Sequence, residues 1–152
     1  MLVDKVSEKL GLETRDLLSE LTVTQALVRY FERNGVKVET EVHRYFPNSD
    51  RFLRIDMVLN NRIAIEVKTS LEMTPLVEGI GKAVLYLQFF KESWLCVPSN
   101  VMEVIQPALN ILGGLPFRVL DFQTLELHER TESAMRKMPL ETYIDSFSRE
   151  ES

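Results

Sequence analysis

The chain has 152 residues, a formal net charge of −5 and a hydrophobic share of 45%. This length allows one substantial core but hardly two, and an acidic balance disfavours a protein that coats nucleic acid nonspecifically. The single cysteine, Cys96, excludes an intramolecular disulfide framework and is expected to be a small core side chain. No apolar run has the length of a signal peptide or a membrane span. We therefore expect a cytoplasmic protein with no membrane contact.

Three segments are expected along the chain. Residues 1–18 form an N-terminal helical or polar extension rich in lysine and glutamate. Residues 19–130 carry the regular patterns and are expected to form the core domain. Residues 131–152 form a polar C-terminal segment with a short amphipathic helix.

The first predicted element of the core is a helix over Ser19–Asn34. A serine at the start can accept a hydrogen bond from the first free amides, and Asn34-Gly35 is a typical stop. The next segment, Val36–Tyr45, alternates in the manner of a strand. The apolar face of the helix is expected to comprise Leu21, Leu27, Val28 and Phe31.

Two strands, Arg51–Leu59 and Ile63–Thr69, are predicted to form a hairpin. Their apolar faces coincide only if Leu59 lies opposite Ile63, and this register puts Asp56 across from Glu66. It requires a three-residue connection, 60–62, or a bulge, with an asparagine in a left-handed conformation. The further pairs expected in this register are Met57 with Ile65 and Ile55 with Val67.

The same hairpin gathers groups that bind metal. Glu66 and Lys68 share one face of their strand, because side chains alternate. Two adjacent carboxylates repel each other, and a divalent cation relieves that repulsion. Hard oxygen ligands favour Mg²⁺ or Mn²⁺. A neighbouring lysine is suited to orient a water or to stabilise charge on a phosphate.

This pattern resembles the PD-(D/E)xK nuclease superfamily, in which Asp56 matches the first acid, Glu66 the second and Lys68 the lysine. Ile55 stands where many members have proline. The resemblance implies an α/β, restriction-endonuclease-like fold, with an α-β-β-β-α-β core and a central mixed sheet flanked by helices. It also implies an Mg²⁺ (or Mn²⁺) site at the two acids, with the Val67 carbonyl as a further ligand.

The elements after the hairpin fit the order of that core. A helix is predicted from Thr74-Pro75 to about Lys91, with proline at its first position. A second helix, Asn100–Leu112, is expected to be interrupted near Pro107. The remaining predicted strands are Ser93–Val97 and Phe117–Phe122.

Further site residues come from the two helices that flank the hairpin. Similar nucleases often place an acid on the first helix, and Glu20 is the match, unless it is an ordinary first-turn glutamate favoured by the helix dipole. Glu41 could take the place of Glu20 as this further acid, and so could Glu39 if the strand register slips. The alternative is that each is a solvated strand residue. Relatives carry a glycine-glutamine pair with an aromatic residue one turn later, which Gly81-Lys82 and Tyr86 resemble. Lys82 and Tyr86 are i, i+4 neighbours on one helix face, so we expect them to meet a phosphate of the nucleic acid together. The alternative is that the tyrosine is core and the lysine faces solvent.

Basic residues lie on or beside the hairpin, where they are expected to bind nucleic acid or only to keep strand edges soluble. We expect a metal-dependent nuclease that acts on DNA rather than RNA, of a small type such as Holliday-junction resolvases. The rival is a catalytically silent nuclease-like domain that binds nucleic acid or assembles with protein; a weaker one is an unrelated α/β binding protein. The basic residues are Arg44, Arg51, Arg54 and Arg62.

A homodimer is also expected, because cutting both strands of a duplex needs two active sites. One apolar stripe near the C-terminus, at i, i+3, i+4 and i+7, is a candidate for the interface. The alternative is that the stripe packs onto its own core. It comprises Leu140, Tyr143, Ile144 and Phe147.

Overall fold

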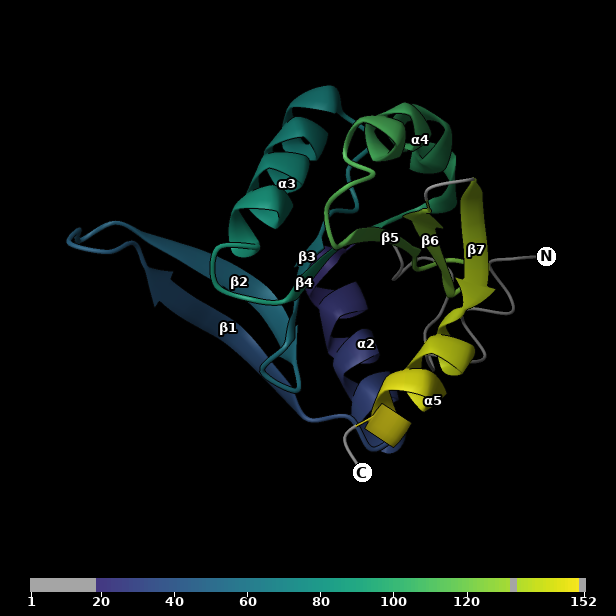
Figure 1. Cartoon of the computed structure of the whole chain (residues 1–152), viewed down its shortest axis with the longest axis horizontal. Coiled ribbons are helices and arrows are strands. Elements are labelled where there is room, and N and C mark those ends of the chain that lie inside the picture. Colours follow the sequence, from purple (N-terminus) through teal and green to yellow (C-terminus); the bar gives the residue numbers. More distant parts are fainter. Residues whose placement is uncertain (1–18, 132–133, 151–152) are drawn as a thin grey trace.

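The computed structural model describes residues 19–131 and 134–150, so the expected N-terminal extension lies outside the described residues. They form one mixed seven-stranded sheet, whose strands follow each other in chain order from β1 to β7, and four α-helices (Figure 1). The β3–β4 and β4–β5 pairs are parallel and the other pairs antiparallel. The elements are α2 Glu20–Arg33, β1 Val38–Tyr45, β2 Phe52–Leu59, β3 Ile63–Val67, α3 Met73–Tyr86, β4 Glu92–Val97, the 3-10 turn η2 Ser99–Val101, α4 Met102–Ile111, β5 Phe117–Asp121, β6 Glu126–Arg130, β7 Met135–Pro139 and α5 Leu140–Glu150.

The α/β class and the mixed sheet are confirmed, with corrections to individual elements. The sheet has three strands more than the expected α-β-β-β-α-β core: β5, which the sequence also predicted, and β6 and β7, which it did not. Helix α3 ends at Tyr86 rather than near Lys91, and Pro75 is its third residue rather than its first. Helix α4 continues through Pro107 instead of being interrupted there. A proline removes one amide hydrogen bond, and the rest of a packed helix can tolerate that loss.

The helices cover the sheet from both sides. One core contains the buried faces of α2 and α5 together with Met57, Ile65 and Trp94. A second core contains α3 and α4 together with Leu95 and Val119. Because alternate residues of the same strands belong to different cores, the two helix pairs lie on opposite faces of the sheet.

Helix α2 starts and stops where its sequence predicts. The Thr22 amide donates to Ser19 Oγ over 3.3 Å, and Gly35 after the helix has φ +79°. Its buried face differs from the prediction, because Leu21 is 67% exposed while Val23 is fully buried. The other buried residues of the helix are Ala26, Leu27, Tyr30 and Phe31.

The C-terminal segment continues the core beyond residue 130. Strand β7 pairs with β6, and α5 inserts Leu140 and Ile144, both buried, into the core that α2 shares. Tyr143 packs against the same core. The apolar stripe therefore packs onto its own core, as the alternative stated, and is not evidence for a dimer interface. The Phe147 side chain lies outside the described residues.

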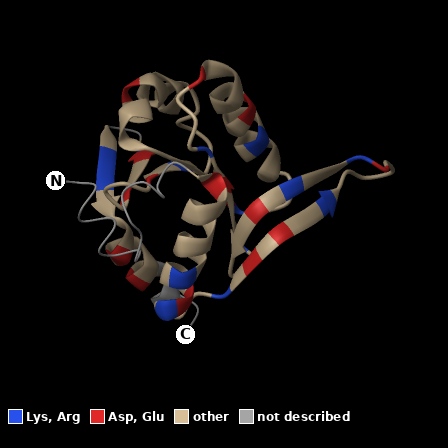
Figure 2. Ribbon diagram, turned by 180° about the vertical axis from the view of Figure 1, so that it is seen from behind, with Lys and Arg blue, Asp and Glu red and all other residues tan. Residues whose placement is uncertain are grey.

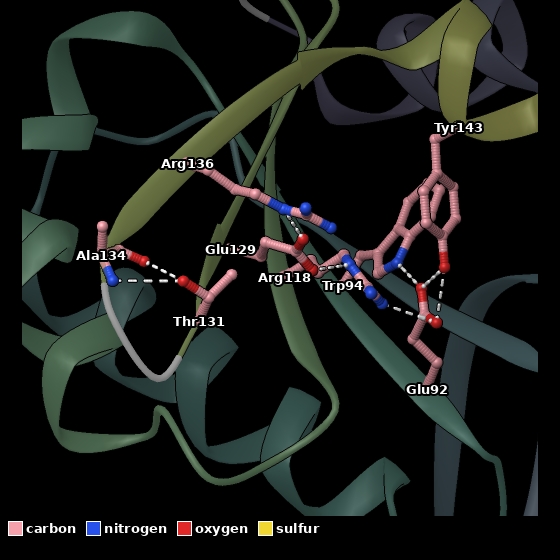
Figure 3. Close-up of polar contacts among 8 residues, drawn as sticks. All are labelled: Glu92, Trp94, Arg118, Glu129, Thr131, Ala134, Arg136 and Tyr143. Carbon is pink, nitrogen blue, oxygen red and sulfur yellow. Dashed lines mark hydrogen bonds and ion pairs between the residues drawn. The ribbon is translucent and has the colours of Figure 1, made fainter.

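A polar network joins this segment to the centre of the sheet (Figure 3). The buried Glu92 carboxylate accepts hydrogen bonds from the Tyr143 hydroxyl at 2.7 and 2.8 Å and from the Trp94 indole N–H. Arg118 Nη1 lies 2.6 Å from Glu92, and its Nε donates to Glu129. Figure 3 shows these side chains converging from β4, β5, β6 and α5. Buried charges are tolerated when they are paired in this way.

Within residues 19–131 and 134–150, no helix combines the length and the apolar character needed to cross a bilayer.

Candidate active site

The β2–β3 hairpin has the register that its apolar pattern predicts. Met57 pairs with Ile65 and Leu59 with Ile63. The connection has three residues, and both asparagines in it are left-handed, with φ 50° at Asn60 and 55° at Asn61. Asn60 Oδ1 also accepts a hydrogen bond from the Lys37 amide at 2.9 Å, which ties the turn to the start of β1.

The ladder stops one residue short of the two acids. The expected Ile55–Val67 pair is not part of it, because the Asp56 side chain takes its place: Oδ2 accepts a hydrogen bond from the Val67 amide at 2.8 Å. Continuing the register by one residue puts Asp56 opposite Glu66, as the sequence predicts. A side chain that replaces a ladder bond is held in a fixed position, which suits a metal ligand.

Glu66 is the buried member of the acid pair, with only 2% of its surface exposed. Its Oε2 accepts a hydrogen bond from the Tyr86 hydroxyl at 2.8 Å and lies 3.9 Å from Lys82 Nζ. The Tyr86 hydroxyl also lies 3.1 Å from the Arg54 carbonyl oxygen. Tyr86 is thus a core side chain whose polar end holds Glu66, rather than the phosphate contact that the sequence suggested.

Burial keeps Glu66 protonated. Loss of hydration raises its pKa from 4.5 to about 8, and the hydrogen bond and charge of Asp56 act in the same direction. Tyr86 and Lys82 oppose the shift without cancelling it. At neutral pH this raised pKa favours the protonated form of Glu66, as expected for a buried carboxyl group beside a second acid.

Lys68 follows the last residue of β3 and points to the same face as Glu66. Its amide donates to the Cys96 carbonyl oxygen at 2.9 Å. Helix α3 comes so close that a Cβ on Gly79 would lie 2.8 Å from Lys68 Cγ and 3.1 Å from Leu95 Cδ1. Gly79 therefore permits the approach of α3 to the lysine stem. Gly81, in contrast, has nothing within 4 Å of such a Cβ.

A cavity of about 790 Å³ gathers the predicted acids and lysine. It lies where the β1–β2 hairpin meets the body, between residues of α2, α3 and the ends of β2 and β3. Along both strands of that hairpin, acidic positions lie nearer the body and basic positions farther out (Figure 2). The lining residues are Glu20, Leu21, Thr24, Gln25, Val28, Arg29, Thr40, Glu41, Arg54, Asp56, Glu66, Lys68 and Lys82.

Glu20 and Glu41 both line this cavity as exposed side chains. Glu41 occupies the position opposite Asp56, between the pairs Thr40–Met57 and Val42–Ile55, and has φ 50° in the middle of β1. Its Oε1 accepts a hydrogen bond from Arg54 Nη2 at 2.6 Å. Glutamate has no preference for the left-handed region, so the sequence gives no signal for this distortion.

The other predicted nucleic-acid contacts are dispersed. Arg54 and Lys82 line the cavity. The Arg44 guanidinium lies 5.2 Å from the centre of the Phe90 ring, and Arg51 is exposed near the far end of the hairpin. Arg62 is not among the cavity residues; its carbonyl accepts a hydrogen bond from the Glu92 amide. Glu39, the other alternative acid, also lies off the cavity, 3.6 Å from Lys37 Nζ.

Across the described ranges, no three His, Cys, Asp or Glu side chains come together as a ready metal-binding group. The carboxylates that line the cavity are those of Asp56 and Glu66, together with the exposed Glu20 and Glu41. Comparisons with family models, with curated proteins and with solved structures each returned no match for this chain. Function therefore has to be inferred from the chemistry of the cavity.

Proposed function

We propose that this protein is a metal-dependent nuclease with a restriction-endonuclease-like core, which hydrolyses phosphodiester bonds in DNA rather than RNA. The observation that carries the proposal is that Asp56, the buried Glu66 and Lys68 line one cavity, with the Asp56 carboxylate held by the Val67 amide. A buried carboxyl group with a raised pKa in a cavity, beside a specific charged partner, is a candidate for a functional site.

The donor set fits Mg²⁺ or Mn²⁺. Asp56 and Glu66 would supply carboxylate oxygens and the Val67 carbonyl a neutral one, which are the hard ligands these ions prefer. A bound ion would polarise the phosphate and lower the pKa of a coordinated water. The Asp56–Val67 hydrogen bond and the Tyr86–Glu66 hydrogen bond each leave the carboxylate anchored through one oxygen.

The other cavity residues have roles that follow from their positions. Lys68 would orient the attacking water and offset the negative charge that develops on the phosphate. Lys82, 3.9 Å from Glu66 and partly exposed, is placed to meet a phosphate oxygen when the acids are ionised. Glu20, at the first turn of α2, would add an acidic group at the rim of the cavity.

A silent nuclease-like binding module is the second candidate. The observation that favours it is that Glu66 is satisfied without a cation, because Tyr86, Asp56 and Lys82 all interact with it. In that case the pair of the buried Glu66 and the half-buried Asp56 would be structural. The two candidates differ in one measurable property, which is whether a divalent cation binds the two acids and displaces the proton of Glu66.

Calorimetry with Mn²⁺ at pH 7, in buffers of different ionisation enthalpy, tests this. A nuclease site binds the ion and releases about one proton, whereas Asp56→Asn abolishes both effects and Lys68→Ala keeps both. Glu39→Gln, which removes an acid off the cavity, is the matched control and should bind as the wild type does.

Cleavage is assayed in parallel with Mg²⁺ and Mn²⁺ on linear duplex, branched and single-stranded DNA. The wild type and Glu39→Gln should cut at least one substrate, and Asp56→Asn, Glu66→Gln and Lys68→Ala should cut none. If the wild type neither binds Mn²⁺ nor cuts any of them, the nuclease proposal is wrong and the binding module stands. Wild-type cleavage by Asp56→Asn would place the active site elsewhere.

A further inference from the structure

The β1–β2 hairpin continues beyond the body of the protein as an arm, residues 42–55 (Figure 1). Strand β3 pairs with β2 only at residues 57–59, so β2 of the arm has β1 as its strand neighbour. The pairs Val42–Ile55 and Tyr45–Phe52 mark the two ends of the ladder within it. A two-stranded ribbon is stable only when one of its faces is packed.

The arm has one packed face and one exposed face. Val42 and Ile55 pack with Tyr86 and Phe90, on the side of α3. Since side chains alternate, the next residues along each strand point to the opposite side. This exposed face carries His43, Tyr45, Phe52 and Arg54.

The exposed face forms a platform of rings. Tyr45 and Phe52 are direct cross-strand partners with ring centres 5.2 Å apart, and the His43 ring lies 4.9 Å from that of Phe52. Tyr45 is 60% exposed and Phe52 46% exposed. Two adjacent rings that stay open to solvent form an apolar surface that a ligand can cover.

The arm also differs in charge from the rest of the chain. It carries three arginines against the single acid Asp50, a formal balance of +2, whereas the whole chain is −5. Of the three, Arg54 is on the exposed face and pairs with Glu41 at the edge of the cavity, whereas Arg44 lies over the Phe90 ring on the α3 side. Arg54 links the arm to the cavity, because it lies on the exposed face and also lines the cavity. A nucleic-acid strand that lay along the arm toward the body would thus pass the aromatic rings first, then Arg54, and then the two acids of the cavity.

We propose that the exposed face of the arm binds an unpaired segment of DNA, whose bases stack on Tyr45 and Phe52 and whose phosphates meet Arg54 and the exposed Arg51 near the tip. Ring platforms with adjacent positive charge are the usual means of holding single strands. Base pairs in a duplex are stacked on each other and offer no free faces to such rings. The proposal deepens the nuclease proposal, on which the direction of the strand toward the cavity rests.

A second copy of the chain fits this surface less well. Pairing two arms face to face would bring Arg54 of each copy toward the same basic face of the other, and like charges in contact are unfavourable. A polyanion has the complementary charge. Single-stranded DNA is therefore the occupant that both the rings and Arg54 favour.

Binding is measured without cleavage, by fluorescence anisotropy of a labelled oligothymidylate of about 12 nucleotides, with EDTA and 50 mM salt. The double variant Tyr45→Ala/Phe52→Ala should bind at least about tenfold more weakly. The matched control, Tyr45→Phe/Phe52→Tyr, keeps both rings and should stay within about twofold of the wild type. A duplex of the same length should bind more weakly to the wild type and should not distinguish the two variants.

Four results would overturn the proposal. In the first, the alanine variant and the ring-swap control bind oligothymidylate equally well. In the second and third, the wild type prefers the duplex, or binds oligouridylate more tightly than oligothymidylate. In the fourth, the alanine variant differs from the wild type only in its sedimentation and not in its binding. The last would mark the rings as an assembly surface. Circular dichroism of both variants should match the wild type, since both rings are exposed. Failure of the nuclease proposal is separate, because binding in EDTA requires neither metal nor cleavage.

Discussion

The Tyr86 hydroxyl donates a hydrogen bond of 2.8 Å to Glu66 Oε2, and this contact joins the last residue of α3 to the centre of β3. Tyr86 is itself fully buried, and burial together with the charge of Glu66 raises its own pKa well above 10. The tyrosine therefore stays a donor at every physiological pH. It fixes one oxygen of the buried acid and favours its ionised form.

Replacing Tyr86 by phenylalanine should weaken metal binding at neutral pH. The ring would still fill the core, but Glu66 would lose a donor that lowers its pKa, so its pKa would rise above about 8. A hydrogen bond to a charged group contributes about 1.5–3 kcal/mol, which corresponds to a shift of about one to two pH units. The pH dependence of Mn²⁺ affinity measures this shift. Lys82→Gln should shift it less, because Lys82 is 3.9 Å from Glu66 and 45% exposed; equal shifts would contradict the role given to Tyr86.

Glu66→Gln should stabilise the metal-free protein more at pH 9 than at pH 5. The pKa of Glu66 is raised in the folded state, so its contribution to stability is fully present below about 4.5 and is lost as the pH rises through about 8. Glutamine resembles the protonated acid and does not titrate. Urea unfolding at pH 5, 7 and 9 checks the difference. A stability difference that is constant with pH would mean that Glu66 is ionised throughout.

The two glycines of α3 should respond in opposite ways to alanine. Gly81→Ala meets nothing within 4 Å and should stabilise the helix by up to about 1 kcal/mol. Gly79→Ala would put a Cβ 2.8 Å from Lys68 Cγ and displace the lysine. Displacement of a catalytic group by about 1 Å lowers the rate by on the order of 100-fold. The check is the single-turnover cleavage rate of each variant compared with that of the wild type. A wild-type rate for Gly79→Ala would show that the position of Lys68 is not critical.

Tyr143→Phe should destabilise the protein without changing the cavity. It removes the hydroxyl that donates to the buried Glu92 carboxylate, at a cost of about 1.5–3 kcal/mol. Tyr45→Phe, on the exposed arm, is the control and should change the free energy of unfolding by less than about 0.5 kcal/mol. Urea unfolding measures the free energy of unfolding, and Mn²⁺ affinity measures whether the acid pair is unchanged. Loss of Mn²⁺ affinity in Tyr143→Phe would link the C-terminal helix to the acid pair.

The sequence by itself determined the features that depend on neighbouring residues. Ser19 and Gly35 bound α2 because capping is a contact within one turn. The hairpin register follows from alternation, since a slip of one residue would turn Met57 and Ile65 out of the core. The opposition of Asp56 and Glu66 is a consequence of that register, which is why both acids could be predicted as a pair.

Only the tertiary structure decided the properties that depend on distant partners. The burial that raises the pKa of Glu66 comes from the packing of α3, and the left-handed Glu41 has no local cause in its sequence. Strand β7 is rich in charge and has a partner only because β6 supplies one. Helix α5 looked like an interface, but it is buried by the core that α2 builds more than a hundred residues earlier. Local patterns fix which way a side chain points along its own element, whereas burial and ionisation depend on what the rest of the chain places against it.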